Sequence, residues 1–217
     1  MLNPGVMMGW NALRVMAKPD PMDPARSCRP FSKDRNGFVV GEGAAALVLE
    51  SATRCRNRGA MALAELVGYG CSSDAAHLTA PDVDGQAQAM RQALGEAKLA
   101  PAQIQYINAH GTATDAGDVV ETQSIRKVFG VAADSVAVSS TKSMHGHLLG
   151  AAGALESIVC AKVIQTGHIP PTINVEDQDP ACDLDVTANV AGRFDGEYVL
   201  NNNFGFGGTN ACVVLKK

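Results

Sequence analysis

Two histidines, each next to a glycine, are the side chains in this sequence best suited to chemistry. His110 lies in the segment 108–114 (NAHGTAT), and His147 lies in the segment 140–153 (STKSMHGHLLGAAG). Imidazole is the side chain that most readily donates or accepts a proton near neutral pH. A single histidine is more often structural than catalytic, but two such loops in one chain are hard to attribute to chance. Together they predict a site at which a carbonyl group is polarised.

The neighbours of these histidines strengthen that prediction. Gly111 allows the backbone to approach a ligand closely. Thr112 and Thr114 offer hydroxyls at alternate positions, which suit a ligand arm rich in amides. His145 lies two residues before His147, and spacing alone does not rank one above the other.

Lys142 and Glu156 are predicted to form a buried ion pair. Lys142 follows a run of small hydroxylic residues and precedes a tight glycine turn, which favours partial burial. A buried ammonium group needs a carboxylate partner. Glu156 is the candidate, because it lies in an otherwise apolar stretch where an unpaired charge would be costly.

A third glycine-rich segment, residues 203–210 (NFGFGGTN), lies near the C-terminus. One interpretation is a tight turn between two strands. The other is a loop whose backbone N–H groups stabilise an oxyanion. The residues alone leave both interpretations open.

The elements that must position these loops alternate between strands and helices. Apolar runs predict a strand, a glycine break and a second strand over 38–50, and further strands over 62–70, 104–107, 136–138, 198–201 and 211–215. Helical periodicity and capping residues predict helices over 7–16, 51–58, 85–99, 117–129 and 150–165. This order indicates an α/β fold with a mixed sheet, and residues 1–217 are expected to form one domain.

Composition excludes several classes of protein. The net charge of −4 and the lack of long Lys/Arg clusters argue against a nucleic-acid partner. The six cysteines are scattered without a Cys-x-x-Cys pair, so we expect reduced thiols and no metal site. No apolar run is long enough for a membrane span, and no signal peptide is recognisable, so a cytoplasmic location is expected.

Four motifs resemble those of a known family. They are the segment 29–44 (RPFSKDRNGFVVGEGA), the His110 segment, the segment 139–147 with His147, and the segment 203–210. In order and spacing they resemble the C-terminal signatures of the elongating β-ketoacyl-[acyl carrier protein] synthases. The resemblance covers essentially the whole chain. It implies the C-terminal half of a thiolase-like fold, with a mixed β-sheet layered between α-helices.

The resemblance also implies a reaction, the decarboxylating Claisen condensation of malonyl-acyl carrier protein with an acyl thioester. Its substrates are carried on the phosphopantetheine arm of acyl carrier protein, and no separate cofactor is implied. His110 and His147 would hydrogen-bond the malonyl thioester carbonyl and stabilise the enolate. Lys142, paired with Glu156, would hold the histidine loop in place.

The remaining roles come from the same resemblance. Thr112 and Thr114 would contact the phosphopantetheine arm. The Phe206 backbone N–H would supply half of an oxyanion hole, and its ring would gate the acyl pocket. Phe204 and Gly207 would contact the substrate. The implied partners are acyl carrier protein and a second thiolase-like subunit, in a homodimer or a heterodimer.

One departure from the family concerns the nucleophile. The family's nucleophilic cysteine lies in the N-terminal half, at the start of a buried helix that lowers its pKa. None of the six cysteines here has that setting, so the chain resembles the C-terminal half alone. The alternative function is therefore a non-catalytic partner subunit, similar to a chain-length factor. Either way, we expect the isolated chain to be unstable or oligomeric, because half of such a core leaves apolar surface exposed.

Overall fold

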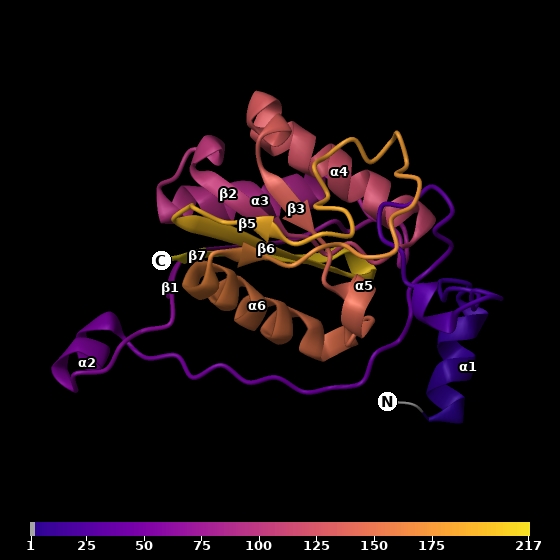
Figure 1. The fold of residues 1–217 in the computed structure, drawn as a ribbon, viewed down its shortest axis with the longest axis horizontal. Helices are drawn as coiled ribbons and strands as arrows, with labels where there is room; N and C mark the ends of the chain where they lie inside the picture. The colour runs from indigo at the N-terminus through magenta and orange to yellow at the C-terminus, as the bar shows by residue number, and fades with distance from the viewer. Residues whose placement is uncertain (1–2) are drawn as a thin grey trace.

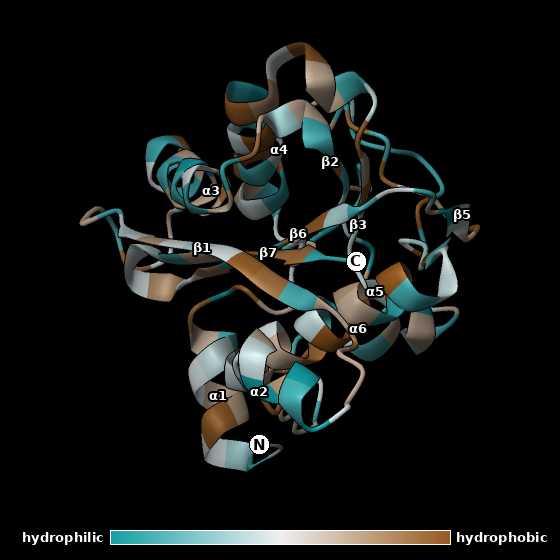
Figure 2. Cartoon of the chain, turned by 90° about the vertical axis from the view of Figure 1, so that its left-hand side faces the viewer, coloured by the Kyte–Doolittle hydropathy of each residue, from teal (hydrophilic) through white to brown (hydrophobic). Residues whose placement is uncertain are grey.

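The centre of the fold is a mixed five-stranded sheet with helices on both faces (Figure 1). The computed structural model describes residues 3–217. The predicted fold class, mixed α/β, is confirmed. Figure 2 shows hydrophobic stretches along the central strands and a largely hydrophilic helix α3, as expected for strands buried between helical layers.

The elements have the following bounds. The α-helices are α1 (Pro4–Ala12), α2 (Ala52–Asn57), α3 (Val83–Ala97), α4 (Asp115–Phe129), α5 (Lys142–His145) and α6 (Ala152–Thr166). The strands are β1 (Glu65–Ser73), β2 (Ile104–Asn108), β3 (Ala137–Ser139), β4 (His168–Ile169), β5 (Gly192–Arg193), β6 (Tyr198–Gly205) and β7 (Thr209–Lys216). The 3₁₀ turns are η1 (Pro24–Arg26), η2 (Pro101–Gln103), η3 (Gly130–Asp134), η4 (Leu149–Ala151) and η5 (Phe206–Gly208).

The strand order is β1-β7-β6-β2-β3. β1, β7 and β6 pair antiparallel, whereas β6, β2 and β3 pair parallel. Helices α3 and α4 cover one face, and α6 covers the other (Figure 1). β4 and β5 form a separate antiparallel pair.

Small residues let helix α3 lie close to strand β1. A Cβ atom added at Gly68 would lie 2.3 Å from the Ala93 carbonyl oxygen, and one at Gly70 would lie 2.2 Å from that of Ala89. No side chain fits in either place. The glycine- and alanine-rich composition therefore sets the distance between this helix and the sheet.

Residues 38–50 form no strand, so the predicted strand, break and strand are wrong. Phe38 and Val40 make only isolated bridges, and residues 41–50 are extended without a sheet partner. Val48 is 96% exposed, and Leu47 and Leu49 are also exposed. Figure 1 shows this segment and α2 running outside the body of the fold. The strand-like sequence is present, but no neighbouring strand in the described part of the chain pairs with it.

Other predicted elements are present with shifted ends. The first helix starts earlier than expected, because Asn3 caps it with an acceptor 2.9 Å from the Gly5 N–H. Strand β1 begins three residues later than expected and ends three later. The four-residue helix α5 and the β4–β5 pair were not predicted from the sequence. Helix α5 matters most, because it carries Lys142 and directly precedes His147.

Candidate active site

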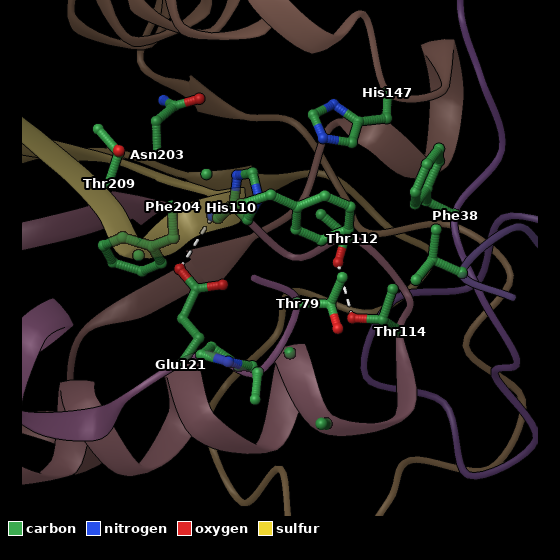
Figure 3. Close-up of a pocket in the computed structure, with 18 of the residues that line it drawn as sticks. Phe38, Thr79, His110, Thr112, Thr114, Glu121, His147, Asn203, Phe204 and Thr209 are labelled. Carbon is green, nitrogen blue, oxygen red and sulfur yellow. Dashed lines mark hydrogen bonds between the residues drawn. The ribbon is translucent and has the colours of Figure 1, made fainter. Parts of the chain in front are cut away.

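The topology brings the two histidines together. β2 and β3 are parallel neighbours, so the chain leaves both strands at the same edge of the sheet. His110 lies two residues beyond β2, and His147 follows the turn of α5 that comes after β3. Their ring centroids lie 5.3 Å apart, with the ring planes at 84°. Figure 3 shows both rings at one pocket.

The pocket has a volume of about 630 Å³. Seven of the residues singled out in the sequence line it: His110, Gly111, Thr112, Thr114, His147, Phe204 and Phe206. Lys142 and Glu156 are fully buried behind the pocket wall, and Gly207 is not among the lining residues. The Gly207 N–H instead donates to the Leu78 carbonyl oxygen at 2.8 Å.

His145 and His147 point to different surroundings. The His147 ring packs against His110 and, at 5.4 Å between centroids, against Phe38. The His145 ring lies outside the pocket, next to Thr141 and the Gly146 carbonyl. The geometry therefore pairs His147, and not His145, with His110.

Both pocket imidazoles are kept neutral. Burial, and then the positive charge of Lys142, lower the pKa of His147 to about 3. The same two causes, with His147 as a third, hold the pKa of His110 well below its ordinary value of 6.5. The Leu149 N–H donates to His147 Nδ1 at 3.2 Å, so the proton of the neutral ring is on Nε2. His110 Nδ1 is buried and has no hydrogen-bond partner within residues 3–217.

Glu121, on α4, fixes the backbone of the His110 loop. Its carboxylate oxygens accept the His110 N–H at 2.9 Å and the Gly111 N–H at 2.7 Å. Figure 3 shows the Glu121 carboxylate pointing toward His110. Burial raises the pKa of Glu121 to about 7, and these two N–H groups act in the opposite direction. Glu121 was not predicted from the sequence, because polar residues follow it on α4 and it does not stand out as a charge in an apolar stretch.

The Lys142 ammonium group lies 2.5 Å from Glu156 Oε1, and neither side chain is exposed. Glu156 comes from α6, on the far side of the turn that carries His147. Burial raises the pKa of Glu156, while the Lys142 charge lowers it. The pair therefore connects α5 to α6 directly behind the histidines.

The loop that carries Thr112 and Thr114 packs closely against Ser140 at Gly111. The hydroxyls of Thr112 and Thr114 lie 3.0 Å apart at the pocket wall (Figure 3). Gly111 has a φ of +34°, and a Cβ atom there would lie 2.5 Å from the Ser140 Cβ. Ser140 therefore occupies the space beside Gly111 that a side chain would need, while Gly111 itself lines the pocket.

Aromatic rings form a continuous row from His147 to Phe206. Phe38 packs against His147, Trp10 packs edge-on against Phe38 at 5.6 Å, and Trp10 lies 5.7 Å from Phe206. Trp10, on α1, lines the pocket and was not singled out in the sequence. The Phe206 ring is 39% exposed at the outer end of this row.

None of the cysteines lines the pocket in the described part of the chain. Cys160 and Cys212 are buried in α6 and β7, and burial raises the pKa of both thiols. Within residues 3–217, no group of three or more His, Cys, Asp or Glu side chains is arranged to hold a metal ion. Nor does any helix in this part have the length and hydropathy to cross a bilayer.

Two family models match the sequence. The model described as "Beta-ketoacyl synthase, C-terminal domain" matches residues 63–176, and "Beta-ketoacyl synthase, N-terminal domain" matches residues 1–54. The chain belongs to the β-ketoacyl synthase family. The resemblance stated from the sequence motifs is thus confirmed, and the two matches meet near the exposed segment that precedes β1.

Individual relatives agree with this assignment. The chain is 49% identical to nodulation protein E of Rhizobium sp. (strain N33), over 98% of the chain and 51% of that protein. It is 47% identical to 3-oxoacyl-[acyl-carrier-protein] synthase 2 of Staphylococcus aureus (strain COL), over 96% of the chain and 50% of that protein. The chain thus spans about half the length of the curated relatives it matches.

A solved structure shows the same fold. The ishigamide ketosynthase/chain length factor superposes with a TM-score of 0.92 and is 42% identical. The match covers all of this chain and 51% of the chain in that structure. The predicted thiolase-like architecture of this part of the fold is therefore confirmed.

Proposed function

We propose that this chain supplies the two-histidine part of the active site for a decarboxylating Claisen condensation. The substrates would be malonyl-acyl carrier protein and an acyl thioester, in fatty-acid or polyketide elongation. The observation that carries the proposal is the convergence of two neutral imidazoles on one pocket, with ring centroids 5.3 Å apart. Family membership and the name of the Staphylococcus aureus relative support the same reaction class.

The chemistry follows from the protonation state of these rings. When malonyl thioester loses carbon dioxide, the electron pair of the broken C–C bond passes into an enolate with negative charge on the thioester oxygen. A neutral imidazole N–H stabilises that oxygen by hydrogen bonding without protonating it outright. His147 meets this need, because Nδ1 accepts the Leu149 N–H and Nε2 carries the proton.

The condensation step then forms a C–C bond. The enolate carbon attacks the carbonyl carbon of the acyl thioester, and the thiolate leaves with the electrons of the C–S bond. We propose that the acyl-bearing thiol comes from a segment or subunit outside the described residues, since no cysteine of this part lines the pocket. The Phe206 N–H and ring are assigned to the oxyanion and the acyl pocket, at the outer end of the aromatic row.

The remaining pocket residues bind and position the substrate arm. Thr112 and Thr114 present adjacent hydroxyls at the wall, where they suit the amides of phosphopantetheine. Phe204 packs 5.9 Å from His110 and forms the apolar side of the pocket. Gly207 is proposed only as the flexible turn of its loop, with a φ of +77°.

Malonyl decarboxylation is the direct test, because it isolates the step assigned to the histidines. His110→Ala and His147→Ala are each expected to slow carbon dioxide release from malonyl-acyl carrier protein by roughly 100- to 1,000-fold, as removal of one oxyanion donor does. The assembled protein is used, and His168→Ala serves as the control because His168 is exposed on β4. Unchanged release in both pocket variants would refute the proposal.

The alternative is a non-catalytic partner that pairs with a complete synthase and shapes its product. It is favoured by a pocket without a cysteine and by the similar structure that contains a chain length factor. The His110–His147 pair and the buried Lys142–Glu156 pair argue against it, because a scaffold needs neither. Normal condensation by a complex that carries both alanine variants would favour this alternative.

Three further expectations stay predictions. They are a single domain over residues 1–217, partnership with acyl carrier protein and a second thiolase-like subunit, and a cytoplasmic location. Gel filtration with acyl carrier protein and with candidate partner subunits tests the second of these.

A further inference from the structure

His145 is a histidine that the proposed reaction does not use. Its ring lies at the end of α5, half-buried and outside the pocket. Nδ1 lies 2.7 Å from the Gly146 carbonyl oxygen, and Nε2 lies 3.1 Å from Thr141 Oγ1. The two ring nitrogens therefore contact the two ends of α5, the N-cap residue Thr141 and the residue after the helix, Gly146.

These contacts define one tautomer. A carbonyl oxygen only accepts hydrogen bonds, so Nδ1 must carry the proton and donate to Gly146. Nε2 of the neutral ring then accepts from the Thr141 hydroxyl. Burial lowers the pKa of His145, the hydrogen bond to the Gly146 carbonyl raises it, and the charge of Lys142 lowers it; the net lowering favours this neutral form.

The Gly146 carbonyl belongs to the same peptide unit as the His147 N–H. On the other side of that unit, the His147 N–H donates to the Val39 carbonyl oxygen at 2.7 Å. The peptide bond between Gly146 and His147 is thus hydrogen-bonded at both its oxygen and its nitrogen.

This peptide unit needs such restraint. Gly146 has a φ of +72°, in the left-handed region, where glycine is free to move between several conformations. Helix α5 is only four residues long, and its N-cap residue, Thr141, makes no side-chain capping bond. Rotation of the peptide unit would move the backbone that carries His147.

We propose that His145 is a positioning residue: its imidazole holds the Gly146 carbonyl and so fixes the peptide unit from which His147 reaches the pocket. The inference rests on the proposed function for its kinetic consequence. Its structural claim, that His145 restrains the peptide unit between Gly146 and His147, is tested separately.

The first test is independent of activity. Nitrogen-15 NMR of histidine rings in the assembled protein should show His145 as the Nδ1–H tautomer, and the Nε2–H tautomer would overturn the proposal. Amide hydrogen exchange at His147 should be faster in His145→Leu than in the unmodified protein. His145→Gln, which keeps one donor and one acceptor, should restore slow exchange. Equal exchange in the leucine variant would also overturn it.

The second test is kinetic. For malonyl decarboxylation, His145→Leu should lower kcat by roughly five- to tenfold with little change in KM, as expected for the loss of about one hydrogen bond acting on geometry. His145→Gln should recover most of that loss. Met144→Leu is the matched control, because Met144 is a half-exposed neighbour on the same turn that does not line the pocket.

The two proposals fail in different ways. Full activity in His145→Leu, with His147→Ala inactive, would overturn the role of His145 and leave the proposed function standing. Full activity in both His110→Ala and His147→Ala would overturn the proposed function. The tautomer and the exchange rate would then still decide whether His145 fixes the peptide unit.

Discussion

Lys142 and Glu156 form an ion pair with no exposed surface on either side chain. The pair joins the short helix α5 to α6, and it lies behind the two histidines rather than in the pocket. Burial, and after it the positive charge of Lys142, lowers the pKa of both pocket imidazoles. The pair therefore supports the turn that carries His147, and its lysine adds to the effect of burial on the two histidines.

Breaking this pair should be costly. Removing one partner leaves the other charge buried and unpaired, so Glu156→Gln and Lys142→Met should each lower the free energy of unfolding by about 3–5 kcal/mol. Replacing both residues together, as Lys142→Met with Glu156→Leu, should recover part of that loss. Urea unfolding at pH 7 measures these differences.

The control for that comparison is an exposed pair. Asp84→Asn removes the partner of Lys127 on the surface and should change the free energy of unfolding by less than about 1 kcal/mol. Single variants as mild as this control would show that Lys142 and Glu156 are not a desolvated pair.

The pKa of His147 predicts how its charge depends on pH. Because that pKa is lowered to about 3, the ring should stay neutral from pH 8 down to pH 5. Nitrogen-15 shifts of the ring should show no inflection in this range. An inflection near pH 6.5, where an ordinary histidine titrates, would contradict the prediction.

The same shift should make the fold sensitive to acid. The unfolded chain binds a proton at His147 as the pH falls through about 6.5, whereas the folded chain binds it only near pH 3. The free energy of unfolding should therefore fall as the pH falls between these values. His147→Gln should show a shallower fall over pH 6 to pH 4, and His168→Gln, an exposed control, should not.

Glu121 should be essential to the His110 loop. Glu121→Ala leaves the N–H groups of His110 and Gly111 without their acceptor, at about 1–3 kcal/mol for each. We expect lower stability in thermal unfolding and slower malonyl decarboxylation. Glu176→Ala, at an exposed surface carboxylate, is the control. A Glu121→Ala protein as stable as its parent would argue against this support.

The exposed apolar side chains of segment 41–50 should cause the isolated chain to self-associate. Val48→Asp should reduce self-association of the isolated chain in analytical ultracentrifugation, because Val48 is 96% exposed beside Leu47 and Leu49. Val131→Asp changes an equally exposed valine on η3 and should have no such effect. A monomeric parent chain with a sharp unfolding transition would contradict the prediction.

The site was largely predictable because its residues lie in short contiguous motifs. His110 lies just beyond β2 and His147 in the segment that follows β3, and parallel neighbouring strands bring such segments to one edge of the sheet. The Lys142–Glu156 contact was predictable because a charge in an apolar helix needs a partner. Trp10 was missed because it reaches the site from α1, far from both histidines in the sequence. Glu121 lies only 11 residues after His110, but the polar residues that follow it on α4 give no sign that its side chain is buried.

Residues 41–50 show what sequence alone does not determine. Their composition favours a strand, but a strand forms only when another strand offers hydrogen bonds. Helix α5 is the reverse case, because it forms although its sequence shows no helical pattern. Four residues with a lysine and a serine carry too little periodicity to indicate a helix. Tertiary contacts hold them in place, from Lys142 to Glu156 and from the Ile173 N–H to the Ser143 hydroxyl.

The row of rings from His147 through Phe38 and Trp10 to Phe206 has a practical consequence. Trp10 is the only tryptophan in the sequence, and its indole lies between a proposed catalytic group and a loop at the pocket mouth. Its fluorescence is therefore a label-free optical signal from within the pocket, assignable to one residue without mutagenesis. Trp10 fluorescence should therefore respond both to ligand binding in the pocket and to movement of the Phe206 loop.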